Sequence, residues 1–91
     1  MIMRHQIEII LGDELRYLAI KTRENLGLTQ RKMSEHLQMS ESSYSDIETG
    51  KSRCSTVTAV LLLAMQKDPE AFLSSVEAKI DKVFRTEAVS V

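Results

Sequence analysis

The sequence predicts an all-α fold with five helices in one domain. Of the 91 residues 43% are hydrophobic, and the chain holds one proline and three glycines, a composition typical of a globular, helix-rich protein. Apolar residues recur at helical spacing along the chain, and oxygen-bearing residues stand where helix N-caps are needed. The length suffices for one compact helical domain with a single core.

The N-terminal segment, residues 1–12, is too apolar for a loose tail and fits either a short helix or a strand. Its apolar residues are Ile7, Ile9, Ile10 and Leu11. A clear helix start follows at Asp13, which can cap a helix with acidic residues in its first turn. Helical spacing then continues through Leu15, Leu18, Ala19, Thr22 and Leu26. Gly27 ends this helix.

Two short helices joined by a tight turn are predicted next. Thr29 would cap a helix over residues 30–37, and Ser40 would cap one over residues 41–49. Gly50 supplies the left-handed conformation that ends the second helix. Five apolar side chains of this stretch can face one core: Met33, Leu37, Met39, Tyr44 and Ile47. Such a pair presents its second helix to a DNA groove, and its helix N-termini attract phosphate.

After Gly50 a fourth helix is expected over residues 55–66. Its apolar face would be formed by Val57, Val60, Leu61, Ala64 and Met65. Leu62 and Leu63 lie off that face, so they must be buried against the N-terminal segment or against a partner chain. A fifth helix begins with Asp68 as its cap and Pro69 at its first position, and should run to about Arg85.

Several features stand in order between Leu15 and Met65. They are Leu15 and Arg23, residues 27–30, Ser40, residues 47–51, and the pattern Val57, Val60, Leu61, Ala64. Together they resemble the helix-turn-helix domain of the Cro and phage-repressor type, also called the xenobiotic response element family. The resemblance implies a repressor-like DNA-binding domain with its helix-turn-helix at the second and third helices. We accordingly divide the chain into an apolar segment (1–12), a helix-turn-helix domain (13–67) and a C-terminal helix (68–91).

The resemblance also implies roles for single residues. Arg23 and Glu48 would form a partly buried ion pair that orients the recognition helix. Gln30 would contact phosphate and brace that helix, and Tyr44 would belong to the core. The expected DNA interface comprises polar residues of both short helices, their caps and the link that follows: Thr29, Gln30, Arg31, Ser40, Glu41, Ser42, Ser43, Ser45, Asp46, Lys51 and Arg53.

The sequence departs from the family pattern at four positions. Ser34 stands where the family has alanine, and Gln38 stands where it has glycine in the turn; a left-handed glutamine costs on the order of 1 kcal/mol. Glu41 and Asp46 stand where the family often has Gln, Arg or Lys facing bases. Either these carboxylates accept hydrogen bonds from cytosine N4, or they are solvated and repel phosphates.

The net charge of −1 argues against strong nonspecific DNA binding, which depends on Lys and Arg neutralising phosphates. Residues 28–53 hold four basic and four acidic residues, and one of these acids, Glu48, has an expected internal partner. The DNA-facing surface can therefore be locally positive around Arg31, Lys32, Lys51 and Arg53.

Other classes of function find little support in the sequence. Cys54 is the only cysteine, and neither His5 nor His36 has a second ligand at metal spacing, so we expect no metal and no cofactor. No nucleophile motif or pair of catalytic carboxylates is recognisable, so we do not expect an enzyme. The apolar runs are much shorter than the roughly 20 residues that cross a bilayer. We expect a cytosolic protein with no membrane partner.

The fifth helix carries an apolar stripe at three-four spacing that can form a homodimer. The expected dimer interface consists of Leu62, Leu63, Leu73, Val76, Ile80 and Val83. Alternatively, this stripe folds back on the first helix and on residues 7–11. The function that these features favour is a sequence-specific DNA-binding transcriptional regulator, a repressor that binds a palindromic operator as a homodimer. The alternative is a protein-interaction or antitoxin-like module with weak or no DNA binding.

Overall fold

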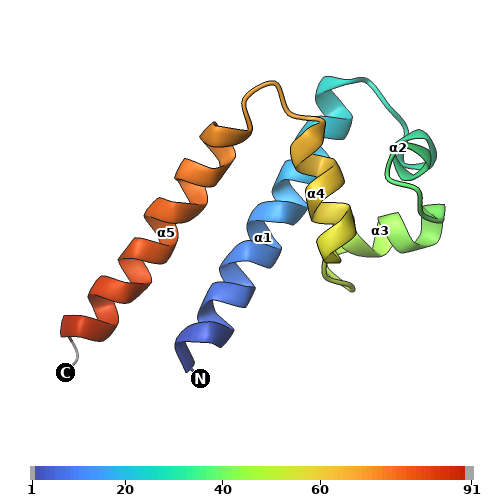
Figure 1. The fold of residues 1–91 in the computed structure, drawn as a ribbon. Coiled ribbons are helices and arrows are strands. Elements are labelled where there is room, and N and C mark those ends of the chain that lie inside the picture. Colours follow the sequence, from blue (N-terminus) through green and yellow to red (C-terminus); the bar gives the residue numbers. More distant parts are fainter. Residues whose placement is uncertain (1, 90–91) are drawn as a thin grey trace.

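The structure, a computed structural model, describes residues 2–89, and over that range it contains five helices and no strand. They are α1 (Ile2–Asn25), α2 (Gln30–His36), α3 (Glu41–Thr49), α4 (Thr56–Ala64) and α5 (Pro69–Val89). Figure 1 shows α1 and α5 running antiparallel, α4 beside α1, and α2 and α3 together at one side of the molecule. The predicted all-α fold with five helices is confirmed.

Local capping hydrogen bonds set most of the helix ends. The Thr29, Ser40 and Ser55 side chains accept hydrogen bonds from the backbone N–H three residues later, at the starts of α2, α3 and α4. Asp68 does the same for α5, with its Oδ1 3.3 Å from the Ala71 nitrogen. At the end of α3, Gly50 is left-handed with φ 83°. These groups satisfy backbone donors and acceptors that a helix end leaves free, so the predicted boundaries there agree with the structure within about two residues.

The start of the first helix was predicted incorrectly. Asp13 does not cap a helix, because α1 is continuous from Ile2 and crosses the expected boundary between residues 12 and 13. A single interior glycine costs a helix only about 1 kcal/mol, so Gly12 does not stop it. Apolar residues before Gly12 are supported by α5, and Ile9 and Ile10 line a groove together with Val83. Residues 2–12 are thus part of a helix whose second half belongs to the core.

The core lies where α1, α2, α3 and α4 meet. Its fully buried cluster consists of Ala19, Met33, Leu37, Tyr44 and Leu62. Met39 is only partly buried against it, while Leu26, expected on the inner face of the first helix, is exposed. The side chain of Gln66 donates to Thr22 Oγ1 at 2.9 Å and to the Leu62 carbonyl at 2.8 Å, which fixes the end of α4 to α1.

The predicted inner face of α4 is only partly correct: Leu61 and Met65 are partly buried against the core, but the other three residues of that face are exposed. Thr58 and Leu62 are the buried residues of this helix, whereas Val57 and Val60 are 68% and 59% exposed, and Ala64 is exposed as well. Leu62 therefore belongs to the core of its own chain and cannot form a dimer interface. Apolar residues surround this helix, so hydrophobic periodicity does not identify the buried side. Packing against α1 decides it.

The stripe on α5 also packs within the chain. α5 makes the most extensive helix–helix contact of the described residues, against α1, and Val76 is buried there. An ion pair between Lys79 and Glu14 joins the same two helices. The expected dimer role of Val76 is thus wrong, and the alternative, in which the stripe folds back on the first helix, describes this residue. Leu73 and Phe84 remain 51% and 49% exposed on α5.

Candidate nucleic-acid interface

The turn between α2 and α3 sets the angle of the candidate recognition helix. Gln38 lies in the left-handed region with φ 60°, as the resemblance to a glycine position predicted. The turn is closed by backbone hydrogen bonds, including Met39 N to the Ser34 carbonyl at 3.0 Å. Ser34 is buried, and its hydroxyl donates to the Arg31 carbonyl at 2.6 Å, so the extra oxygen at this alanine position is satisfied.

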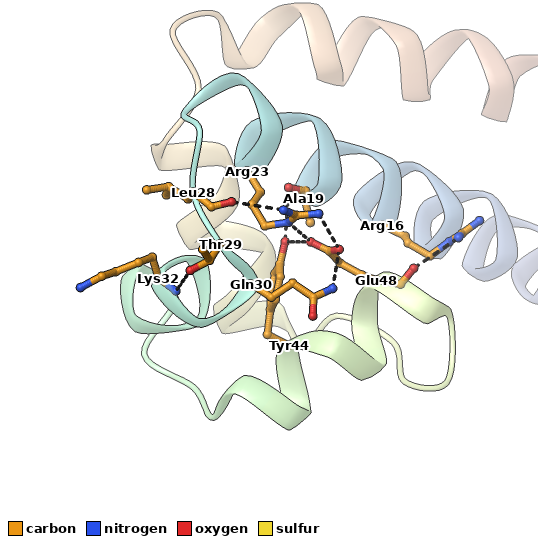
Figure 2. Close-up of polar contacts among 9 residues, drawn as sticks. All are labelled: Arg16, Ala19, Arg23, Leu28, Thr29, Gln30, Lys32, Tyr44 and Glu48. Atoms are coloured by element: carbon orange, nitrogen blue, oxygen red, sulfur yellow. Dashed lines mark hydrogen bonds and ion pairs between the residues drawn. The ribbon is translucent and has the colours of Figure 1, made fainter.

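A buried carboxylate, that of Glu48, fixes α3 to α1 and α2 (Figure 2). Arg23 Nε and Nη2 donate to Glu48 Oε2 and Oε1 at 2.7 and 3.2 Å, which forms the ion pair implied by the family resemblance. Gln30 Nε2 donates to Oε1 at 2.9 Å, and the Tyr44 hydroxyl donates to Oε2. The Glu48 side chain is 7% exposed. Each carboxylate oxygen therefore accepts two hydrogen bonds from described residues, enough to stabilise a buried charge.

This network determines the protonation states of its members. Burial raises the pKa of Glu48, but hydrogen bonds from Arg23, Tyr44 and Gln30 outweigh it and hold the pKa below the ordinary value of 4.5. The hydrogen bond to Glu48 raises the pKa of Arg23. Burial and, second, the hydrogen bond to Glu48 raise the pKa of Tyr44. At neutral pH the carboxylate is charged and the tyrosine is a neutral donor.

The N-terminal turn of α3 is open to solvent. Ser40 caps it, and its hydroxyl lies 2.8 Å from the Ser43 Oγ. Glu41, Ser42 and Ser43 are exposed, whereas Ser45 and Asp46, also expected at the DNA interface, are half-buried. The structure therefore leaves three of the expected α3 residues open to solvent and covers the other two in part.

Two residues of this region have roles that the sequence did not predict. Thr49 is exposed and lies seven positions after Ser42 and four after Ser45 on α3, so helical spacing could have added it to the surface set. Tyr44 was expected to be a plain core residue, yet its hydroxyl binds Glu48. The i, i+4 spacing of these two residues on one helix was the available signal.

The basic residues of the expected interface are largely engaged by carboxylates. Arg31 and Lys32 each lie within ion-pair distance of Glu35, at 3.9 and 3.6 Å. Arg53 Nη1 lies 3.2 Å from Glu8 Oε2 on α1. Lys51 is exposed, and no described residue forms an ion pair with it. Such exposed pairs are weak, typically about 0–1 kcal/mol, so these cations can exchange a carboxylate for a phosphate.

Thr29 and Gln30 begin α2 beside this network. Thr29 is exposed, and its Oγ1 accepts from the Lys32 nitrogen at 3.1 Å. Figure 2 shows Gln30 between the start of α2 and Glu48.

Among the described residues, no group of three His, Cys, Asp or Glu is placed to hold a metal ion. No described helix is both long and apolar enough to cross a membrane.

Comparison with protein families gives a match. A family model described as a helix-turn-helix domain matches residues 10–65, more than half of the chain. This agrees with the predicted resemblance to the Cro and phage-repressor type, and helix-turn-helix DNA-binding domains are typically non-enzymatic. No curated protein and no solved structure matches the chain.

Proposed function

The chain belongs to the helix-turn-helix domain family, and we propose that it binds double-stranded DNA as a sequence-specific transcriptional regulator, a repressor in the simplest case. The observation that supports this most directly is the arrangement of α2 and α3. Both helices begin with a side-chain cap at an exposed turn, and the buried Glu48 holds α3 against the rest of the domain. A fixed helix with an open N-terminal turn is what groove reading requires.

In this proposal α3 enters the major groove while α2 lies across the backbone. The small hydroxyl side chains of Ser42, Ser45 and Thr49 approach base edges, where serine and threonine can contact any base pair. Thr29, Gln30 and Arg31 at the start of α2 meet phosphates, since helix N-termini favour anions. Lys51 and Arg53 contact the backbone beyond α3. Glu41 and Asp46 accept hydrogen bonds from cytosine N4, which raises specificity and lowers affinity.

Binding as a homodimer to a palindromic operator is part of this proposal. Two copies held about one helical turn of DNA apart read two half-sites. The surface that suits this role is a stripe of α5 at heptad-like spacing, formed by the exposed Leu73 and Phe84 and the partly buried Ile80. Val83 and Leu63, which were expected at the interface, are each partly buried in the single chain.

A second candidate function uses the same face for a protein partner. Two observations favour it: Arg31, Lys32 and Arg53 are paired with carboxylates, and α3 carries Glu41 and Asp46 in addition to the buried Glu48. This surface is therefore less positive than phosphate binding prefers. An antitoxin-like or other protein-interaction module with weak DNA binding would have this charge pattern.

The experiment that separates the two is fluorescence anisotropy with labelled duplex DNA from upstream of the chain's own gene, at low and moderate salt. We expect binding that survives an excess of unrelated competitor DNA, since specific sites bind typically 10³-fold or more tightly. Lys51→Ala should weaken binding to all sequences and reduce the salt slope by about one. Ser42→Ala should weaken operator binding without lowering the Tm. Gln30→Ala should weaken operator binding and also lower the Tm, because it removes a hydrogen bond to the buried Glu48 carboxylate. Equal, weak binding to every duplex would favour the protein-interaction module.

A further inference from the structure

Gln30 has a donor that the protein does not use. A glutamine amide carries two N–H donors. One is donated to Glu48 Oε1 at 2.9 Å, and no described residue accepts the other. This hydrogen bond fixes the direction of the first N–H, and because the amide group is planar it restricts the second N–H to a limited set of directions. That N–H lies at the first residue of α2, at the surface proposed to meet phosphate.

The geometry of this amide depends on how firmly the Glu48 carboxylate is held. Arg23, which lies on α1, donates to both carboxylate oxygens. The Tyr44 hydroxyl donates to Oε2 from one turn earlier on α3, the same helix as Glu48. A carboxylate held by donors from two helices cannot rotate freely, so its Oε1 stays in one place for Gln30.

The hydroxyl of Tyr44 is not needed to fill the core. The Tyr44 ring is fully buried beside Met33 and Leu62, and a phenylalanine ring would occupy the same space. Tyr44 therefore packs in the core as a phenylalanine would and, in addition, donates a hydrogen bond to the polar network.

We propose that Tyr44 is a positioning residue for DNA binding: through Glu48, its hydroxyl holds the Gln30 side chain so that the second amide N–H is directed at a DNA phosphate. This inference rests on the proposed function. Without the hydroxyl, Glu48 Oε2 keeps a single donor, the carboxylate turns toward Arg23, and Gln30 adopts several rotamers. DNA binding must then order Gln30 again, which lowers affinity.

Tyr44→Phe tests the proposal, with Tyr17→Phe as the matched control because Tyr17 is exposed on α1. In the DNA-free protein, the two side-chain amide NMR signals of Gln30 should shift and broaden in Tyr44→Phe and stay unchanged in Tyr17→Phe. Operator affinity should fall about five-fold in Tyr44→Phe alone. Should this variant melt below the measuring temperature, fluorotyrosine at both tyrosines keeps the hydroxyl, changes its acidity and should shift the same signals.

A double-mutant cycle separates positioning from a general structural effect. In a Gln30→Ala background, Tyr44→Phe should cause no further loss of operator affinity. Equal losses in both backgrounds would overturn the proposal, as would Gln30 signals that do not respond to Tyr44→Phe. A parent protein that binds no DNA would overturn the proposed function and the phosphate contact together. The NMR signals would still decide whether Tyr44 positions Gln30.

Discussion

Glu8 and Arg53 form an ion pair across 45 positions of sequence, with Arg53 Nη1 3.2 Å from Glu8 Oε2. The pair connects the first half of α1 to the link that follows α3. Glu8 also lies 3.5 Å from Arg4 Nε one turn earlier. A cation expected to meet phosphate is thus held by a carboxylate of a helix outside the helix-turn-helix unit.

Glu8→Gln should therefore strengthen DNA binding. Releasing Arg53 from an exposed ion pair frees it for a phosphate, and we expect affinity to rise about two- to five-fold at low salt with a steeper salt slope. Anisotropy with a random duplex measures this. Glu77→Gln, which removes the same charge from the exposed side of α5, is the control. Equal gains in both variants would mean that net charge alone is responsible.

Arg23→Ala should destabilise the fold. It leaves the carboxylate of Glu48, 7% exposed, without its cationic partner, and breaking a buried ion pair costs about 3–5 kcal/mol. For a domain of this size, this corresponds to a fall in Tm of at least about 12 °C. Circular dichroism melts measure it, with Arg31→Ala at an exposed pair as the control. A Tm within a degree or two of the parent would show that the pair contributes little.

The stability of the protein should fall at acidic pH through Glu48. Its pKa is lower in the folded state than the ordinary 4.5, so the unfolded chain takes up a proton first. The stabilisation is complete above pH 4.5 and is lost as the pH falls through the folded pKa. Urea unfolding from neutral to acidic pH measures this. The stability difference between the parent and Glu48→Gln should shrink as pH falls, and a constant difference would contradict the expectation.

Gln38→Gly should stabilise the protein. Gln38 adopts φ 60°, a conformation that costs a residue with a side chain about 1–2 kcal/mol. Glycine removes this strain but adds about 0.4–1 kcal/mol of unfolded-state entropy, so we expect a net gain of about 0.5–1 kcal/mol. Gln38→Ala keeps the strain and should give no gain. A lower midpoint in urea for Gln38→Gly would show that the glutamine side chain itself contributes to the turn.

Leu73→Asp combined with Phe84→Asp should give a folded monomer that binds a palindromic operator more weakly and a single half-site as well as the parent does. Both side chains are about half exposed on α5, so the charges cost the single chain little. Sedimentation velocity and melting curves measure the outcome. Val76→Asp, at a buried position, should instead unfold the domain. A parent that sediments as a monomer at operator-binding concentrations would exclude the dimer.

The sequence by itself determined mainly the helix ends and turns, which depend on hydrogen bonds between residues close together in the chain. Thr29, Ser40 and Asp68 cap helices because each reaches a backbone N–H only three residues away. Gly50 and Gln38 are left-handed where the turn pattern requires it. The pairing of Arg23 with Glu48 was also foreseeable, although through the resemblance to a known family and not from spacing.

Only the tertiary structure decided which sides of the long and apolar helices are buried. Asp13 was expected to begin a helix, but the residues before it lie against α5 and belong to the same helix, so α1 begins at Ile2. Leu62 and Val57 are equally apolar, and only the position of α1 determines that Leu62 is buried and Val57 exposed. Hydrophobic burial is non-directional and depends on area. The sequence of a helix with apolar residues on several sides therefore does not indicate which side is buried against its neighbour. The Gln30 amide likewise has its direction because three helices bring Arg23, Gln30 and Tyr44 to one carboxylate.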